Sequence, residues 1–181
     1  MAVPLDLTQR LGEGWCVTVT VLAPALTLDM MGVARVSEVP DGLTVASRRI
    51  PQRLPEVMLL AKEKGEGSLV LEVEGTIGWI GAGAEMLGEL SEAGRACTIY
   101  RDPNKIELLV AEDGDVIGGM SAVSLSSWGS FDERWTEGLD ETSGTPSQCA
   151  VLALEAITGV GLDAGALDDP WLGGLTKGPT Y

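Results

Sequence analysis

The feature that most constrains this fold is a pair of apolar-rich runs joined by Asp113-Gly114. A two-residue hairpin turn of type I′ needs a positive φ at both central residues, and Asp-Gly adopts that conformation at little cost. The flanking runs, residues 105–112 and 115–123, alternate with the period of two that is typical of strands. Both runs are apolar on each face, so we expect the second face to be partly covered. The sequence therefore predicts an antiparallel hairpin.

The rest of the chain extends this hairpin to a sheet with short helices. Further strands are expected at 15–22, 68–74 and 95–101, where β-branched and other apolar residues gather. Helices are expected at 84–93 and 146–158, and the second follows Thr145-Pro146-Ser147-Gln148, a capping box with proline at the first helical position. We expect an α+β fold whose mainly antiparallel sheet is covered on one face by a few short helices.

The length of 181 residues suits a single domain with a sizeable core. Residues 1–162 are expected to form this domain. Residues 163–181 contain Pro170 and Gly173-Gly174, and we expect a loosely ordered tail. Residues 125–144 are rich in serine, glycine and acids, which predicts a long irregular connection of the kind that is often functional.

Charge and hydropathy exclude two classes of partner. The formal net charge is −15, and phosphate backbones repel such a surface, so we expect no nucleic-acid partner. No run approaches the ~18 apolar residues of a membrane span, and the first residues lack the basic and apolar parts of a signal peptide. We expect no membrane partner and a cytoplasmic location.

The sequence contains no histidine, which excludes Ser-His-Asp and Cys-His catalysis and the usual histidine zinc sites. Cys16, Cys97 and Cys149 are far apart and lie among apolar residues, so buried free thiols are expected. Glu72 and Glu74 are a candidate acid–base pair on one strand face, but a solvated face is the favoured explanation. We expect no metal and assign no catalytic residue.

A glycine pattern tests whether a nucleotide cofactor is expected. Gly81-Ala82-Gly83 follows a predicted strand and opens a predicted helix, as a dinucleotide-binding loop does. The third glycine of that pattern is Met86 here, and the chain continues into an antiparallel hairpin rather than another βαβ unit. We therefore expect no cofactor.

Aromatic residues supply the candidate binding site. Trp79 follows Gly78 in a glycine-rich loop, where it either caps the sheet or makes an exposed contact with a partner or ligand. Trp128, Phe131 and Trp135 lie in the 125–144 connection and suggest an aromatic pocket. These five residues are the candidate partner-binding or ligand-binding positions.

Three short motifs carry a resemblance to known proteins: Trp15-Cys16-Val17-Thr18, Gly78-Trp79-Ile80-Gly81 and Ala156-Ile157-Thr158-Gly159-Val160. With them the chain resembles an actinobacterial family of unknown function that has an N-terminal W-C-[VL]-T strand and a central Gly-Trp-x-Gly loop. The resemblance covers residues 10–162. The family often has Ser or Thr where this chain has Ala23. It has no known activity, so the resemblance implies no catalytic residue.

Two functions are consistent with these features. The first is a non-catalytic, acidic protein-binding module, immunity-like or regulatory, with a protein as its partner. The alternative is a small-molecule-binding protein or cofactor-free enzyme of specialised metabolism that uses a Trp-lined pocket and one carboxylate. Whether the chain is an enzyme stays open, with the balance against it.

Overall fold

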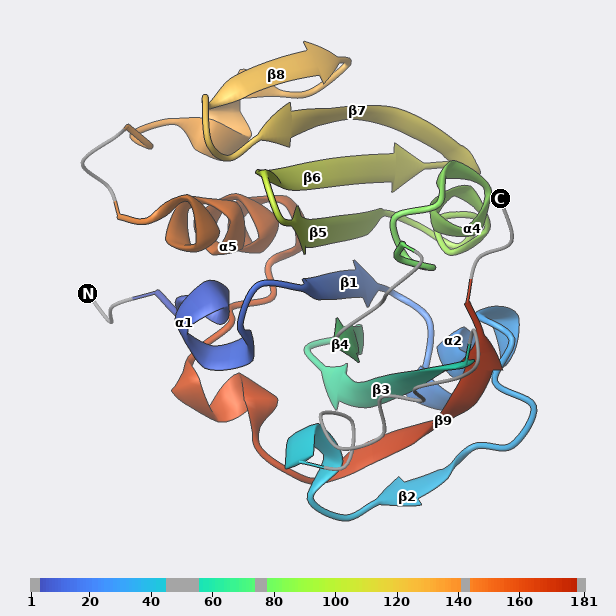
Figure 1. Cartoon of the computed structure of the whole chain (residues 1–181). Helices are drawn as coiled ribbons and strands as arrows, with labels where there is room; N and C mark the ends of the chain where they lie inside the picture. The colour runs from blue at the N-terminus through green and yellow to red at the C-terminus, as the bar shows by residue number, and fades with distance from the viewer. Residues whose placement is uncertain (1–3, 45–55, 74–77, 141–143, 179–181) are drawn as a thin grey trace.

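The structure, a computed structural model, describes residues 4–44, 56–73, 78–140 and 144–178. Figure 1 shows strands stacked into one sheet with helices beside it. In chain order the elements are α1 (Leu7–Leu11), β1 (Trp15–Thr20), α2 (Pro24–Met30), β2 (Ser37–Val39), β3 (Glu56–Lys64), β4 (Gly67–Val73), α4 (Ala84–Glu89), β5 (Ala96–Asp102), β6 (Lys105–Glu112), β7 (Asp115–Ser121), β8 (Ser126–Gly129), η1 (Glu133–Thr136), α5 (Pro146–Thr158), η2 (Ala164–Leu167) and β9 (Trp171–Lys177).

The nine strands form one sheet in the order β2-β9-β3-β4-β1-β5-β6-β7-β8, and every neighbouring pair is antiparallel. The predicted α+β fold with a mainly antiparallel sheet is thereby confirmed. At the β6–β7 turn Asp113 has φ 51° and Gly114 has φ 90°, the two positive values that an Asp-Gly hairpin turn requires. The strongest local signal in the sequence thus produced the expected structure.

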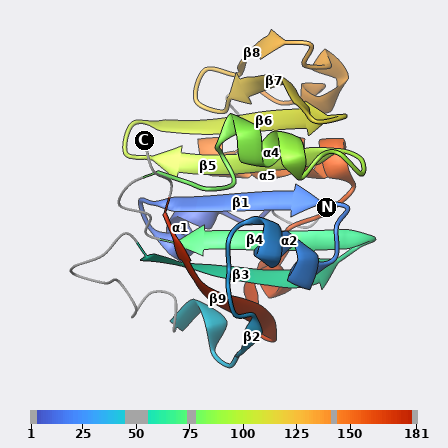
Figure 2. The ribbon, with the colours of Figure 1, turned by 90° about the vertical axis from the view of Figure 1, so that its right-hand side faces the viewer.

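Helices cover both faces of the sheet, which corrects the prediction that they cover one. Figure 2 shows α2 and α4 in front of the sheet and α5 behind it. Val17 of β1 belongs to the same core cluster as Leu154 of α5. Val70 of β4 and Leu87 of α4 belong to the core cluster on the opposite side of the sheet. Every residue of β1 is buried. A strand that is apolar or buried on both faces needs cover on both, and the sequence signalled this at the hairpin.

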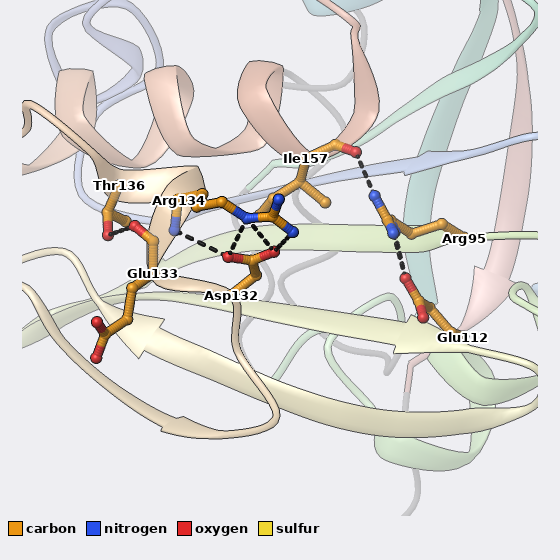
Figure 3. Close-up of polar contacts among 7 residues, drawn as sticks. All are labelled: Arg95, Glu112, Asp132, Glu133, Arg134, Thr136 and Ile157. Carbon is orange, nitrogen blue, oxygen red and sulfur yellow. Dashed lines mark hydrogen bonds and ion pairs between the residues drawn. The ribbon is translucent and has the colours of Figure 1, made fainter.

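Helix α5 begins as predicted and is tied to the sheet at its end. The Thr145 hydroxyl accepts a hydrogen bond from the Gln148 N–H at 3.3 Å, and the Gln148 side chain accepts one from the Thr145 N–H at 2.9 Å. At the other end Arg95 donates to the Ile157 carbonyl oxygen at 3.0 Å and to Glu112 Oε1 at 2.6 Å, as Figure 3 shows. A cation near the last carbonyls of a helix is favourable because it opposes the helix dipole.

Residues 171–177 form an interior strand, which corrects the prediction of a loosely ordered tail over 163–181 as far as the described residues reach; residues 179–181 lie outside them. Strand β9 lies between β2 and β3, and Trp171 at its start is 1% exposed. Gly173 and Gly174 suggested a loose chain, but they serve close packing. A Cβ atom on either would lie 2.5 Å from a backbone carbonyl oxygen, that of Leu59 or that of Arg35. Glycine is used here because the neighbouring chain approaches too closely for any side chain.

No helix within the described ranges combines the length and apolar character that crossing a membrane requires.

Candidate functional site

Trp79 takes the buried arrangement of the two that the sequence left open. It is 5% exposed and packs against Cys16 and Tyr100 on the face that carries α4. Its indole N–H donates to Asp102 Oδ1 at 3.0 Å. Gly78, immediately before it, is half-buried with φ 100°, a conformation that favours glycine. Trp79 is therefore a fixed wall of the structure rather than an exposed anchor.

The other predicted aromatic residues divide between the two faces. The 125–144 connection contains β8 and η1, so part of it is regular. Phe131 and Trp135 pack edge to face at 5.1 Å against the α5 side of the core, and the Arg95 guanidinium lies 5.0 Å from the Trp135 ring. Trp128 is 52% exposed and lies over Gly119, on the same face as Trp79. The structure therefore does not bring the four aromatic residues into one pocket.

A buried carboxylate holds the loop that follows Trp79. Glu72 is 1% exposed, and its two oxygens accept hydrogen bonds of 2.8 Å from the N–H groups of Ile80 and Gly81. Burial raises the pKa of Glu72 above its ordinary value, although the hydrogen bonds from Gly81, Ile80 and the Cys16 thiol act in the opposite direction. Glu74, its predicted acid–base partner, lies outside the described residues. Glu72 is thus sealed behind the loop that it positions.

The three cysteines are buried free thiols, as the sequence predicted. Burial raises the pKa of each: the shift of Cys16 is increased further by Glu72, and that of Cys149 by Asp140. The Cys16 sulfur lies 3.2 Å from Thr98 Oγ1, which in turn lies 3.0 Å from Thr18 Oγ1. A thiol held in its protonated form is a weak nucleophile, so these cysteines fit packing better than catalysis.

A groove with a volume of about 880 Å³ lies on the α2–α4 face. It is bounded by the end of α2, the loop from Trp79 into α4, and the end of β9, three segments that converge on one side of the sheet in Figure 2. We call it the methionine groove. Its lining residues are Met30, Met31, Gly32, Ala34, Glu56, Trp79, Ile80, Gly83, Ala84, Glu85, Met86, Leu175, Thr176, Lys177 and Gly178.

Carboxylates surround this groove with few cations to balance them. Glu56 and Glu85 line it and are exposed, and within the described part of the chain neither lies within 4 Å of a cationic side chain. Lys177 is the one cation among the lining residues described. Beyond α4 lie the exposed side chains of Glu89, Glu92, Asp113 and Asp115, where the helix packs on the β6–β7 turn. The potential over this side of the molecule is therefore negative.

A second groove of about 580 Å³ lies where β3 extends past the start of β9, beneath the start of α2. Its walls include Trp171, Pro24 and two lysines. The Lys62 Nζ lies 4.4 Å from the centre of the Trp171 ring and donates to the Asp168 carbonyl oxygen. Burial and the neighbouring Lys64 lower the pKa of Lys62. We call this the β3 groove.

Neither groove could be predicted from the sequence, because the segments that form its walls are far apart in the chain. No local pattern in the sequence indicates that Met30 and Met31 lie beside Met86 and Leu175. Strand β9, which supplies one wall of each groove, lies in the segment that was predicted to be a loosely ordered tail. Only the glycine-rich loop around Trp79 pointed to this side of the molecule.

Among the residues that the structure describes, no group of three His, Cys, Asp or Glu side chains is placed to hold a metal ion. Comparisons with protein-family models, with curated proteins and with solved structures found no match. The resemblance to an actinobacterial family therefore stays a prediction.

Proposed function

We propose that this chain is an acidic, non-catalytic protein-binding module, and that a basic amphipathic helix of its partner docks in the methionine groove. The observation that carries the proposal is an apolar groove with three methionines among its lining residues and, at its rim, carboxylates that form no ion pair with a described cationic side chain. A helix that docks by this mode lays its apolar face in the groove and its charged face along the edges.

Methionine suits the floor of such a groove. Its unbranched thioether side chain adapts to differently shaped partners at little cost. Met30 of α2 and Met86 of α4 are half-buried, so each can contact a ligand and still pack against the core on this face of the sheet. Leu175, at the third wall, is 38% exposed and adds apolar area. These side chains supply the contact surface that an amphipathic helix would bury.

Charge supports a basic partner. The chain carries 27 acidic and 12 basic residues, and none of the described basic side chains in ion pairs lines this groove. Glu56 and Glu85, which pair with no cationic side chain of the described residues, can meet lysine or arginine side chains of a partner. Such charge pairing speeds association and selects the partner more than it adds affinity.

The buried groups support a role without catalysis. The Glu72 carboxyl is closed off behind Ile80 and Gly81, which leaves it no path to a substrate in the groove. The thiols are equally enclosed, with their pKa values raised. Acid–base and nucleophilic catalysis both need a titratable group within hydrogen-bond reach of the reacting atom.

Calorimetric titration with two synthetic helical peptides tests the proposal. One peptide has lysines on its polar face, and the other has glutamates in the same positions. We expect the basic peptide to bind, and its affinity to fall as salt rises because the rim carboxylates become screened. Replacing Met30 and Met86 together by alanine should weaken binding about tenfold or more, the usual scale for central interface contacts.

Charge variants supply the matched control. Glu56→Gln with Glu85→Gln should weaken binding of the basic peptide and flatten its salt dependence. Glu133→Gln with Glu137→Gln removes the same charge near η1 on the opposite side of the sheet and should leave the affinity almost unchanged. Equal binding of both peptides, or an affinity insensitive to the methionine variant, would contradict the proposal.

The β3 groove favours the second function, binding of a small molecule in a Trp-lined pocket. Trp171 and Lys62 both line this groove, with the Lys62 ammonium group 4.4 Å from the centre of the largely buried Trp171 ring. A bound ligand would raise the melting temperature and change tryptophan fluorescence. Screening metabolites by these two signals, with Lys62→Met as the comparison, tests this alternative separately from the peptide titration.

A further inference from the structure

The edge of the sheet at β8 differs in charge from the rest of the molecule. Residues 116–131 form the longest run in the chain without an acidic or basic residue. Within this run Val123 is 58% exposed and Trp128 is 52% exposed, the two highest values among the large apolar side chains described. An exposed apolar surface on so acidic a chain is a candidate contact area.

The backbone of β8 is also available for pairing. It is the last strand of the sheet, each of its four residues is exposed, and Figures 1 and 2 both show its outer edge uncovered. The Ser130 N–H donates to the Ile117 carbonyl oxygen at 2.8 Å. Because alternate residues of an antiparallel strand direct their N–H and C=O groups toward the same neighbour, this bond shows which residues of β8 face β7. Two residues further along, Trp128 pairs inward with Gly119, so Ser127 directs its N–H and C=O to the open edge.

The opposite edge of the sheet is protected in the usual way. Strand β2 has only three residues, Ser37–Val39, and its central residue is the exposed Glu38. Short, charged edge strands resist pairing with another chain. Strand β8 is nearly as short, with four residues, but it has neither a charge nor a proline to block its edge.

We propose that two copies of this chain associate edge to edge through β8, antiparallel about a two-fold axis at Ser127. The N–H of each Ser127 then donates to the carbonyl oxygen of the other, and the two Trp128 side chains lie diagonally on one face, within reach of each other. A second copy fits this edge because the two-fold axis brings the same uncharged residues of both chains together. Two chains of charge −15 repel each other over most of their surface, and the uncharged strip is where they can meet.

Sedimentation velocity over a range of protein and salt concentrations tests this pairing. We expect a monomer–dimer equilibrium, with the dimer favoured by salt because salt screens the repulsion between the chains. This salt dependence is opposite in sign to that of peptide binding in the methionine groove. The two proposals can therefore fail independently.

Variants at Ser127 identify the contact. Ser127→Pro removes the outward N–H without removing a β7–β8 hydrogen bond, and should raise the dimer dissociation constant about tenfold or more, for two lost hydrogen bonds. Ser127→Lys should do the same by placing a charge at the edge. Ser37→Lys places the same charge on β2 and should leave the dimer unchanged. Circular dichroism and melting temperature confirm that each variant folds.

A wild-type chain that stays monomeric at high protein and salt concentrations would overturn the proposal. So would a folded Ser127→Pro chain that dimerises as tightly as the wild type.

Discussion

Replacing Glu72 by glutamine isolates the buried carboxyl group that positions the Trp79 loop. The carboxyl oxygens accept the N–H groups of Ile80 and Gly81, one each, at 2.8 Å. A glutamine side chain has one acceptor oxygen, so its NH₂ group must face the second N–H. A buried donor without an acceptor costs about 1–3 kcal/mol. We therefore expect Glu72→Gln to lose stability of that order at neutral pH.

The pH dependence of this loss carries the sharper prediction. The folded pKa of Glu72 is raised, so the folded state holds the proton more tightly than the unfolded state. The stability due to this proton is fully present below the ordinary carboxyl pKa and is lost as pH rises through the folded value. Between the two pKa values the wild type should lose up to about 1.4 kcal/mol per pH unit relative to Glu72→Gln, which has no such proton.

Urea unfolding of both proteins at a series of pH values measures this difference. Subtracting the free energy of unfolding of Glu72→Gln from that of the wild type removes the contributions of the other titrating groups, provided that both proteins unfold in a two-state manner. The excess free energy of unfolding of the wild type over Glu72→Gln should be largest in acid and should shrink toward neutral pH. If it grows with pH instead, the three hydrogen-bond donors outweigh burial and the carboxylate is held ionised, which would refute this reasoning.

Three further predictions follow from contacts described above. Gly81→Ala would place a Cβ atom 2.1 Å from Thr18 Oγ1, so we expect a lower melting temperature by the equivalent of about 1–3 kcal/mol; an unchanged midpoint would contradict this packing. Arg95→Met removes the donor to the Ile157 carbonyl oxygen, so amide exchange in the last turn of α5 should accelerate while its first turn stays protected. The three thiols should resist a thiol reagent until the protein unfolds, and rapid labelling of any of them in the native state would refute their burial.

The parts of the fold that were predicted correctly are those fixed by local chemistry. The Asp113-Gly114 turn and the capping box at Thr145 each depend on a few adjacent residues, and both formed as expected. The observed strands β1 and β4–β7 begin and end within two residues of their predicted bounds. Local conformational preference was sufficient there, because no distant contact had to be known.

The parts that were not predicted depend on distant contacts. The face that α4 takes is decided by its packing on the β6–β7 turn, where a Cβ on Gly88 would lie 2.3 Å from the Gly114 carbonyl oxygen. Glycines in β9 indicated a loose tail until the neighbouring backbone was known. The burial of Trp79 likewise depends on Tyr100 and Asp102, which lie more than twenty residues further along the chain. The local sequence does not indicate which distant segments will come into contact.

The place of β9 within the sheet has a consequence for synthesis on the ribosome. Among the described strands β2 pairs only with β9, and β3 has β9 on one side. Until residues 171–177 have emerged, β3 therefore presents an unpaired edge and β2 has no strand to join. Exposed strand edges on incomplete chains promote aggregation. A pause in translation shortly before residue 171 would lengthen the time for which the nascent chain needs protection by a chaperone.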